Sequence, residues 1–190
     1  LLGRLTGYQF YLAQSGSQAG RDMSSERVNA TVLAVECKRY GDETELKTPE
    51  LLGKLAQAVD AIPQLDVWVL VASRSVPDQL YSALRHLADR FHVDVRIVSV
   101  NDEFPSSLEV LCAHSPDIVL SDLRAAKVPG ILAIESELIR IASHEDFSRK
   151  RDRIRAQFTE SAGYDAARQR LQDWLVDRLS SETSSRGALG

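Results

Sequence analysis

Cysteine and histidine are too few and too scattered in this sequence to build a covalent or metal framework. The chain has 190 residues, with two cysteines and four histidines. Two isolated cysteines, Cys37 and Cys112, indicate no disulfide framework. The histidines lie in unrelated contexts without the spacing of a zinc site. We therefore expect neither a disulfide nor a zinc centre, and we expect both cysteines to be small core residues.

Two common hydrolase motifs are also absent. No Gly-rich loop of the Walker type occurs, so this chain is not expected to hydrolyse nucleotides by itself. No Gly-x-Ser-x-Gly sequence occurs, which leaves an acyl-transfer enzyme without a nucleophile elbow.

The sequence has no long apolar run and no strong charge of one sign. No segment approaches the roughly 18 to 20 apolar residues that span a bilayer, and no charged start leads into an apolar signal segment. We expect a cytoplasmic protein that does not engage a membrane. The net charge of −4 argues against a surface that grips nucleic acid over its whole extent, but it leaves a local groove open.

The most informative segment is residues 31–38, which is rich in β-branched and apolar residues and predicts a strand. Side chains alternate along a strand, so Glu36 and Lys38 share one face while Val35 and Cys37 point to the other. A polar segment precedes the strand, and Asp22 lies before that segment. A hairpin connection would make Asp22 and Glu36 neighbours on adjacent strands.

These residue types suit metal-assisted hydrolysis. Mg²⁺ prefers oxygen ligands, commonly one or two carboxylates with waters and a phosphate oxygen, and Asp22 and Glu36 can supply the carboxylates. Lys38 can orient or deprotonate the attacking water and offset the charge that develops on the phosphate. The alternative is a solvated Glu36–Lys38 pair on an edge strand with Asp22 as an ordinary turn residue. The pattern alone leaves both interpretations open.

Gly20-Arg21-Asp22, followed after thirteen residues by Glu36-Cys37-Lys38 on an apolar strand, resembles the motif of the PD-(D/E)XK restriction-endonuclease-like superfamily. Arg21 stands where the proline of the name would be. Together with the strand-like run at residues 65–74, the segment is similar to Mrr-like nuclease domains. The similarity is greatest to those found at the N terminus of bacterial antiviral STAND NTPases and related phage-defence effectors. It covers roughly residues 5 to 115.

The resemblance implies an α/β fold with a restriction-endonuclease-like mixed sheet flanked by helices. It implies Asp22, Glu36 and Lys38 as catalytic residues, with Mg²⁺ or Mn²⁺ bound by Asp22, Glu36 and the backbone carbonyl of Cys37. Gln14 and Gln57 are candidates for positioning water or phosphate, although an exposed glutamine is the simpler explanation of Gln57. Family members often place a further carboxylate on the first helix. No acidic residue precedes Asp22 here, and without a starting Met the chain is expected to be a fragment or to have a disordered beginning.

The function implied is a metal-dependent endonuclease effector that cleaves DNA, expected to be double-stranded, with little sequence specificity and with self-association. The alternatives are an inactive nucleic-acid or protein-interaction module of the same fold and a nuclease specific for RNA or junctions.

The remaining sequence predicts a nuclease core over residues 1–142, a helical extension or stem over 143–180 and a disordered tail over 181–190. The extension can pack on the core, mediate self-association or lead into a following domain. Thr48 is the expected cap of one helix. Ser75 is the expected cap of a second helix, whose inward face would include Phe91. The basic run of residues 149–155 is flanked by acids and favours a solvated helix face over a phosphate-binding strip.

Overall fold

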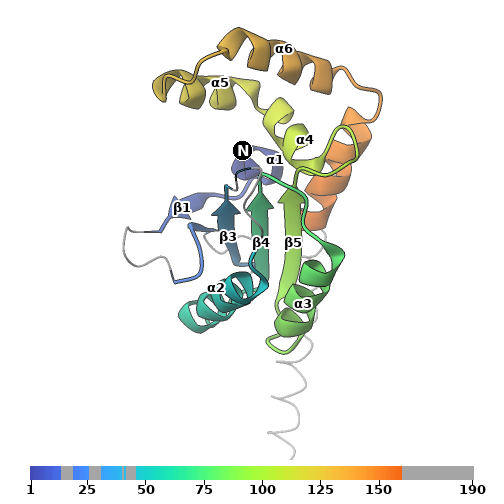
Figure 1. The fold of residues 1–190 in the computed structure, drawn as a ribbon. Helices are drawn as coiled ribbons and strands as arrows, with labels where there is room; N and C mark the ends of the chain where they lie inside the picture. Colours follow the sequence, from blue (N-terminus) through green and yellow to red (C-terminus); the bar gives the residue numbers. More distant parts are fainter. Residues whose placement is uncertain (14–18, 26–30, 40, 42–45, 160–190) are drawn as a thin grey trace, which may run out of the picture.

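The computed structural model describes residues 1–13, 19–25, 31–39, 41 and 46–159, and within them the chain is a mixed α/β fold (Figure 1). In chain order the elements are α1 (Leu2–Thr6), β1 (Phe10–Leu12), β2 (Met23–Ser25), β3 (Leu33–Lys38), α2 (Thr48–Ala61), β4 (Val67–Ala72), α3 (Asp78–Asp89), β5 (Asp94–Ser99), α4 (Ser107–His114), α5 (Pro116–Ala125) and α6 (Ile131–Ala142). A further helix follows over residues 147–159. Within the described ranges, no helix is long and apolar enough to cross a bilayer.

The five strands form one mixed sheet in the order β1-β2-β3-β4-β5. β1, β2 and β3 are antiparallel neighbours, whereas β3, β4 and β5 run parallel to one another. The sheet changes direction at β3, where Val35 faces Met23 on the antiparallel side and Val69 on the parallel side. The parallel steps contain α2 and α3, as crossover connections require. The prediction of a mixed sheet flanked by helices is therefore confirmed.

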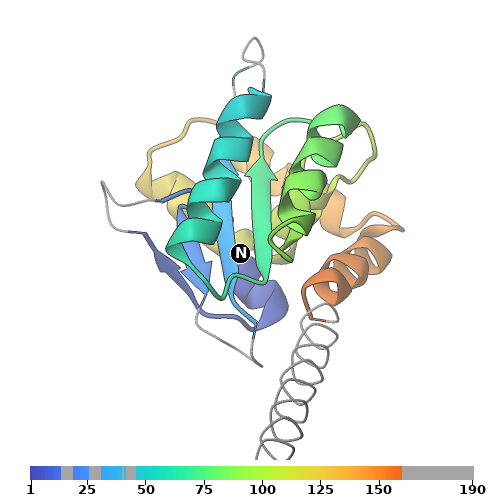
Figure 2. The same ribbon diagram turned by 90° about the horizontal axis from the view of Figure 1, so that it is seen from below.

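Helices cover both faces of this sheet (Figures 1 and 2). α2 and α3 share a core with Ala34 of β3 and Trp68 of β4. α1, α4 and the helix over residues 147–159 share a second core with Leu33 and Val35. The two cores alternate along β3 because successive side chains of a strand point to opposite faces.

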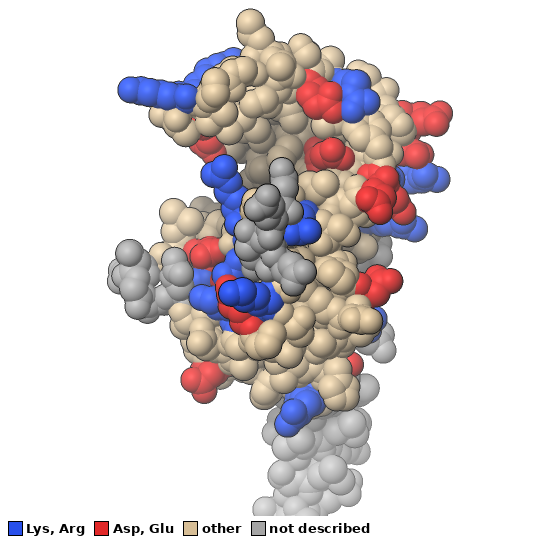
Figure 3. Space-filling model, in the orientation of Figure 1, with Lys and Arg blue, Asp and Glu red and all other residues tan. Residues whose placement is uncertain are grey.

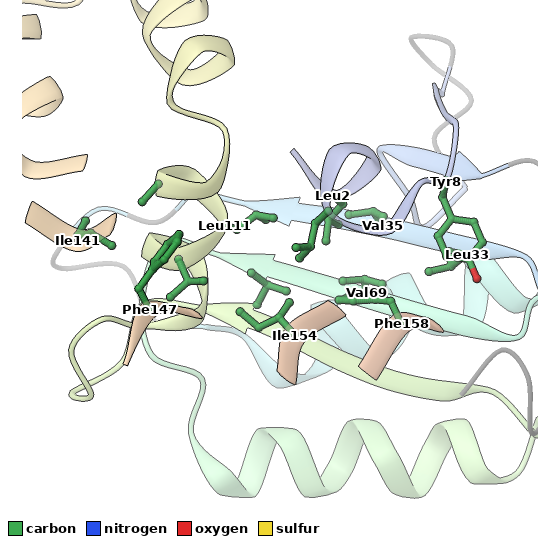
Figure 4. Close-up of a cluster of buried hydrophobic side chains, with 14 of the residues drawn as sticks. Leu2, Tyr8, Leu33, Val35, Val69, Leu111, Ile141, Phe147, Ile154 and Phe158 are labelled. Carbon is green, nitrogen blue, oxygen red and sulfur yellow. The ribbon is translucent and has the colours of Figure 1, made fainter. Parts of the chain in front are cut away.

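The helix over residues 147–159 is held to the sheet by an apolar stripe. Phe147, Ile154 and Phe158 are buried and point into the cluster that contains Val35 and Val69 (Figure 4). Of the roles left open for residues 143–180, packing on the core therefore applies to the described part, which ends at residue 159. The rest of that segment and the tail lie outside the described residues.

The predicted helix starts near residues 48 and 75 are wrong in detail. α2 includes Thr48, with Lys47 at the cap position and no side-chain capping hydrogen bond. Pro77, not Ser75, immediately precedes α3, again without a side-chain cap. A proline stands at each start instead, Pro49 in the first turn of α2 and Pro77 directly before α3. Phe91 lies after the end of α3 and is 42% exposed instead of facing inward.

Candidate active site on strand β3

Glu36 and Lys38 lie at the carboxyl end of β3 and face helix α2. The predicted shared face is confirmed, because Lys38 Nζ lies 3.1 Å from Glu36 Oε1. Glu36 is only 2% exposed. A buried carboxylate costs free energy unless it is paired or binds a cation. We therefore expect a cationic side chain or a metal ion beside Glu36.

Asp22 is fixed to β3 beside Glu36. Its backbone N–H donates to the carbonyl of Val35 at 2.8 Å, and its Oδ2 accepts from the backbone N–H of Cys37 at 2.6 Å. The side chain thus takes the place of a main-chain acceptor at the end of the β2–β3 pairing. Asp22, directly before β2, is therefore held beside Glu36 of the adjacent strand β3, as the sequence predicts.

Helix α2 and strand β4 contact the turn that carries Asp22 and fix its position. Gly20 has a φ of +77°, and a Cβ there would lie 1.9 Å from the carbonyl oxygen of Lys54, so only glycine fits. The Gly20 carbonyl accepts a hydrogen bond from the buried indole of Trp68 at 3.2 Å. These contacts with α2 and β4 fix the position of Asp22 relative to β3.

Helix α2 contributes two charged side chains to the site. Glu50 Oε1 lies 2.9 Å from Lys38 Nζ, and Lys54 Nζ lies 3.8 Å from Glu36 Oε1. Glu50 and Lys54 are four residues apart and therefore share one face of the helix. α2 thus places Glu50 against Lys38 of β3 and Lys54 against Glu36 of β3.

These contacts keep Lys38 in its charged form. Burial alone would lower the pKa of Lys38, but hydrogen bonds to Glu50 and Glu36 and the charges of both carboxylates outweigh burial and raise that pKa. The same hydrogen bond and charge from Lys38 lower the pKa of Glu50. Lys38 is therefore an ammonium at neutral pH in this arrangement.

Within the part of the chain that the structure describes, the second oxygen of Glu36 has no partner. Glu36 Oε2 is buried and lacks a hydrogen bond among the described residues, although such atoms in native proteins nearly always have one. The Nε and Nη1 atoms of Arg21 are likewise buried and unpartnered. In the described part of the chain, no three His, Cys, Asp or Glu side chains form a metal-binding group. A cation at Glu36 would therefore use Asp22, backbone oxygen and water, and the orphaned carboxylate oxygen fits that role.

Gln14, Gln57 and Cys37 are the other predicted residues of this charged cluster. Gln14 lies outside the described residues, and Gln57 is exposed, three residues beyond Lys54 on α2. Cys37 was expected in the core, and this expectation is wrong, because the residue is exposed. The covering helix α1 leaves an apolar cavity of about 360 Å³ there, lined by Cys37 with Met23 and Val71 among others. The residue as a whole is exposed, but its thiol is partly enclosed by its neighbours, and this enclosure with the charges of Asp22 and Glu36 raises the pKa of Cys37 to about 11.

Sequence reasoning missed Glu50 and Lys54 as members of the site. Lys54 is visible on the polar face of the predicted helix, but so is Gln57, and periodicity does not say which turn meets the strand. The signal lies in the connection between β3 and β4. A helix that returns antiparallel to β3 brings its first turns to the carboxyl end of that strand, which favours residues 50 and 54 over 57.

Comparison with known proteins identifies no relative of this chain. No model of a known family, no curated protein and no solved structure matches the chain. Its function is therefore inferred from the side chains around Glu36 and from the motif that they form.

Proposed function

We propose that this chain is a divalent-metal-dependent nuclease domain of the PD-(D/E)XK restriction-endonuclease-like class. The carrying observation is the buried Glu36 carboxylate, whose Oε2 has no partner among the described residues and which lies beside Asp22 and Lys38. The mixed sheet supports the assignment, since the Asp turn and the Glu-x-Lys strand are adjacent in it. The substrate class proposed is duplex DNA, cleaved with little sequence selection.

Each charged residue has a distinct role in this proposal. Asp22, Glu36 and the Cys37 carbonyl hold Mg²⁺ or Mn²⁺, and a bound metal supplies a more acidic water and stabilises charge on the phosphate. Lys38 presents its ammonium to the phosphate or to the attacking water. The raised pKa of Lys38 favours this role over that of a proton acceptor.

The DNA-binding surface is proposed to be local. Among the described residues on the face shown in Figure 3, basic and acidic side chains are interspersed. A domain with a net charge of −4 then gains affinity from a few phosphate contacts or from several copies acting on one duplex. Self-association, as in phage-defence effectors, is part of the proposal for that reason.

A second candidate is a non-catalytic interaction module that keeps the same fold. Two observations favour it: Lys38 and Lys54 already neutralise Glu36, and α1 carries no acid. Such a module would need no divalent cation. Metal binding therefore separates the two candidates.

The test is a gel assay of supercoiled plasmid, linear duplex DNA and single-stranded RNA in Mg²⁺, Mn²⁺ or EDTA. We expect metal-dependent cutting of DNA. Lys38→Met and Asp22→Asn should each reduce it by about 10²-fold to 10³-fold, the range seen when one charge-stabilising group is removed. Asp22→Asn keeps an oxygen that can accept the Cys37 N–H, so the turn should stay in place.

Matched controls are Lys47→Met and Asp60→Asn, which remove exposed charges of the same sign from the cap and end of α2. Both should cut like the parent chain. Full activity in Lys38→Met would overturn the mechanism, and cutting of RNA alone would overturn the substrate class. If nothing is cut, the assay is repeated on an artificially oligomerised fusion together with a Mn²⁺ titration. Absence of both cutting and binding would establish the non-catalytic module.

A further inference from the structure

Lys54 reaches the buried carboxylate of Glu36 but is held there loosely. Its Nζ is 3.8 Å from Glu36 Oε1, whereas Lys38 Nζ is 3.1 Å from the same oxygen and 2.9 Å from Glu50. At 3.8 Å the contact is one of charge without a hydrogen bond. Among the described residues, no closer partner is recorded for Lys54, and its side chain is 26% exposed.

The two lysines therefore differ in how easily they can leave Glu36. Lys38 belongs to the same strand as Glu36 and is also fixed by Glu50, so it remains when the charge around Glu36 changes. Lys54 comes from α2 on a flexible four-carbon stem and has one weak contact. A divalent cation at Glu36 would repel both ammonium groups, and Lys54 is the one free to move.

We propose that Lys54 is the counter-ion of Glu36 in the metal-free protein and becomes a ligand of the substrate phosphate when a divalent cation binds. This inference rests on the proposed nuclease function. It makes α2 a bifunctional element, since Glu50 holds the lysine of β3 and Lys54, one turn later, supplies a second cation. The substrate group recognised is a phosphodiester oxygen next to the bound metal.

The first experiment is a calorimetric titration with Mn²⁺ alone, in the absence of nucleic acid. Lys54→Met removes a positive charge that competes for Glu36, so Mn²⁺ should bind about threefold to tenfold more tightly than to the parent chain. Lys54→Arg keeps the charge and should bind like the parent. Lys47→Met removes a charge from the same helix without a contact to Glu36 and should change the affinity by less than Lys54→Met does. Circular dichroism checks folding, and Lys54→Gln replaces Lys54→Met if that variant fails to fold.

The second experiment measures the binding of a labelled duplex by fluorescence anisotropy as salt is varied. All proteins carry Lys38→Met, so that the duplex stays intact. With Mn²⁺ present, adding Lys54→Met should reduce the slope of log affinity against log salt by about one, which is the loss of one phosphate contact. In EDTA the slope should stay the same, because Lys54 is then engaged with Glu36.

The outcomes separate this inference from the function on which it rests. If the parent chain binds Mn²⁺ and cuts DNA but Lys54→Met leaves both Mn²⁺ affinity and the salt slope unchanged, the role of Lys54 is wrong and the nuclease remains. Weaker Mn²⁺ binding in Lys54→Met would also overturn the inference. If the parent chain binds no Mn²⁺, the nuclease proposal and the role of Lys54 fall together.

Discussion

Two clusters of charge in this molecule, one on β3 and α2 and one on the helix over residues 147–159, differ in burial and in how their charges are paired. In the cluster on β3 and α2, Glu36 is 2% exposed and pairs with Lys38 and Lys54 across two elements. In the basic run on the helix over residues 147–159, the Arg149 side chain is 75% exposed and pairs with Asp146 within one turn. Arg151 pairs with Asp152, the next residue.

The two clusters differ in the free energy that is lost when their charges are removed from water. Exposed pairs within one helix contribute about 0 to 1 kcal/mol and need no functional explanation. A buried carboxylate loses its hydration and regains that loss only with well-placed partners. The number of charges in a segment therefore says little about function, whereas a buried, incompletely partnered carboxylate says much. The proposed nuclease site and the solvated helix face follow from this distinction.

The largest effect on stability is expected from the apolar side of the helix that carries the basic run. Phe158 is 2% exposed in the core below the sheet, so Phe158→Ala should lower the free energy of unfolding by about 3 to 5 kcal/mol. Urea unfolding followed by circular dichroism measures it. Arg149→Met on the same helix should change stability by less than about 0.5 kcal/mol. Equal effects of the two substitutions would mean that the charges, and not the apolar stripe, attach this helix.

Stabilisation by Mn²⁺, an effect of intermediate size, should depend on Glu36 and not on exposed acids. With Mn²⁺ at 100 times its dissociation constant, the parent chain should gain about 2.7 kcal/mol of stability, because the cation binds only the folded state. Glu36→Gln keeps the shape of the side chain and removes the charge, so this gain should disappear. Thermal unfolding with and without Mn²⁺ measures it, and Glu135→Gln on α6 is the control. A gain that survives in Glu36→Gln would place the cation elsewhere.

The site strand could be predicted because its signals are local. The alternation around Glu36 and Lys38 and the spacing from Asp22 are readable in one dimension, and β4 lies at residues 67–72 as the apolar run indicates. Contacts between distant elements are not readable in this way. Glu50 and Lys54 meet β3 only because α2 returns along it, and the need for glycine at position 20 is visible only where the backbone of α2 passes close to it.

The sequence also does not show which elements cover the faces of the sheet. Cys37 alternates correctly with Glu36, but it lines a cavity beside α1 instead of being enclosed, so a residue on the apolar face is exposed. The helix over residues 147–159 shows a sparse apolar stripe in sequence, too weak to reveal that it completes one of the two cores. Periodicity identifies a face and leaves open what covers it.

The smallest predicted effect concerns Glu50, which joins features of both clusters. It is exposed like the acids of the basic run, with 44% of its side chain accessible, yet it bonds to the half-buried Lys38. The hydrogen bond and charge of Lys38 lower its pKa from the ordinary 4.5. Its stabilising contribution is therefore complete above the unfolded-state pKa and is lost as the pH falls through the folded-state pKa.

Glu50→Gln should consequently cost more stability at pH 7 than at pH 3. Because Glu50 is largely solvated, the difference at pH 7 should be only about 0.2 to 1 kcal/mol. Urea unfolding of both proteins at the two pH values measures it, with Glu135→Gln, whose side chain is 41% accessible, as the matched acid. A cost that is the same at both pH values would mean that Glu50 holds Lys38 by shape and not by charge. The charge of Glu50 would then contribute nothing to the position of the proposed catalytic lysine.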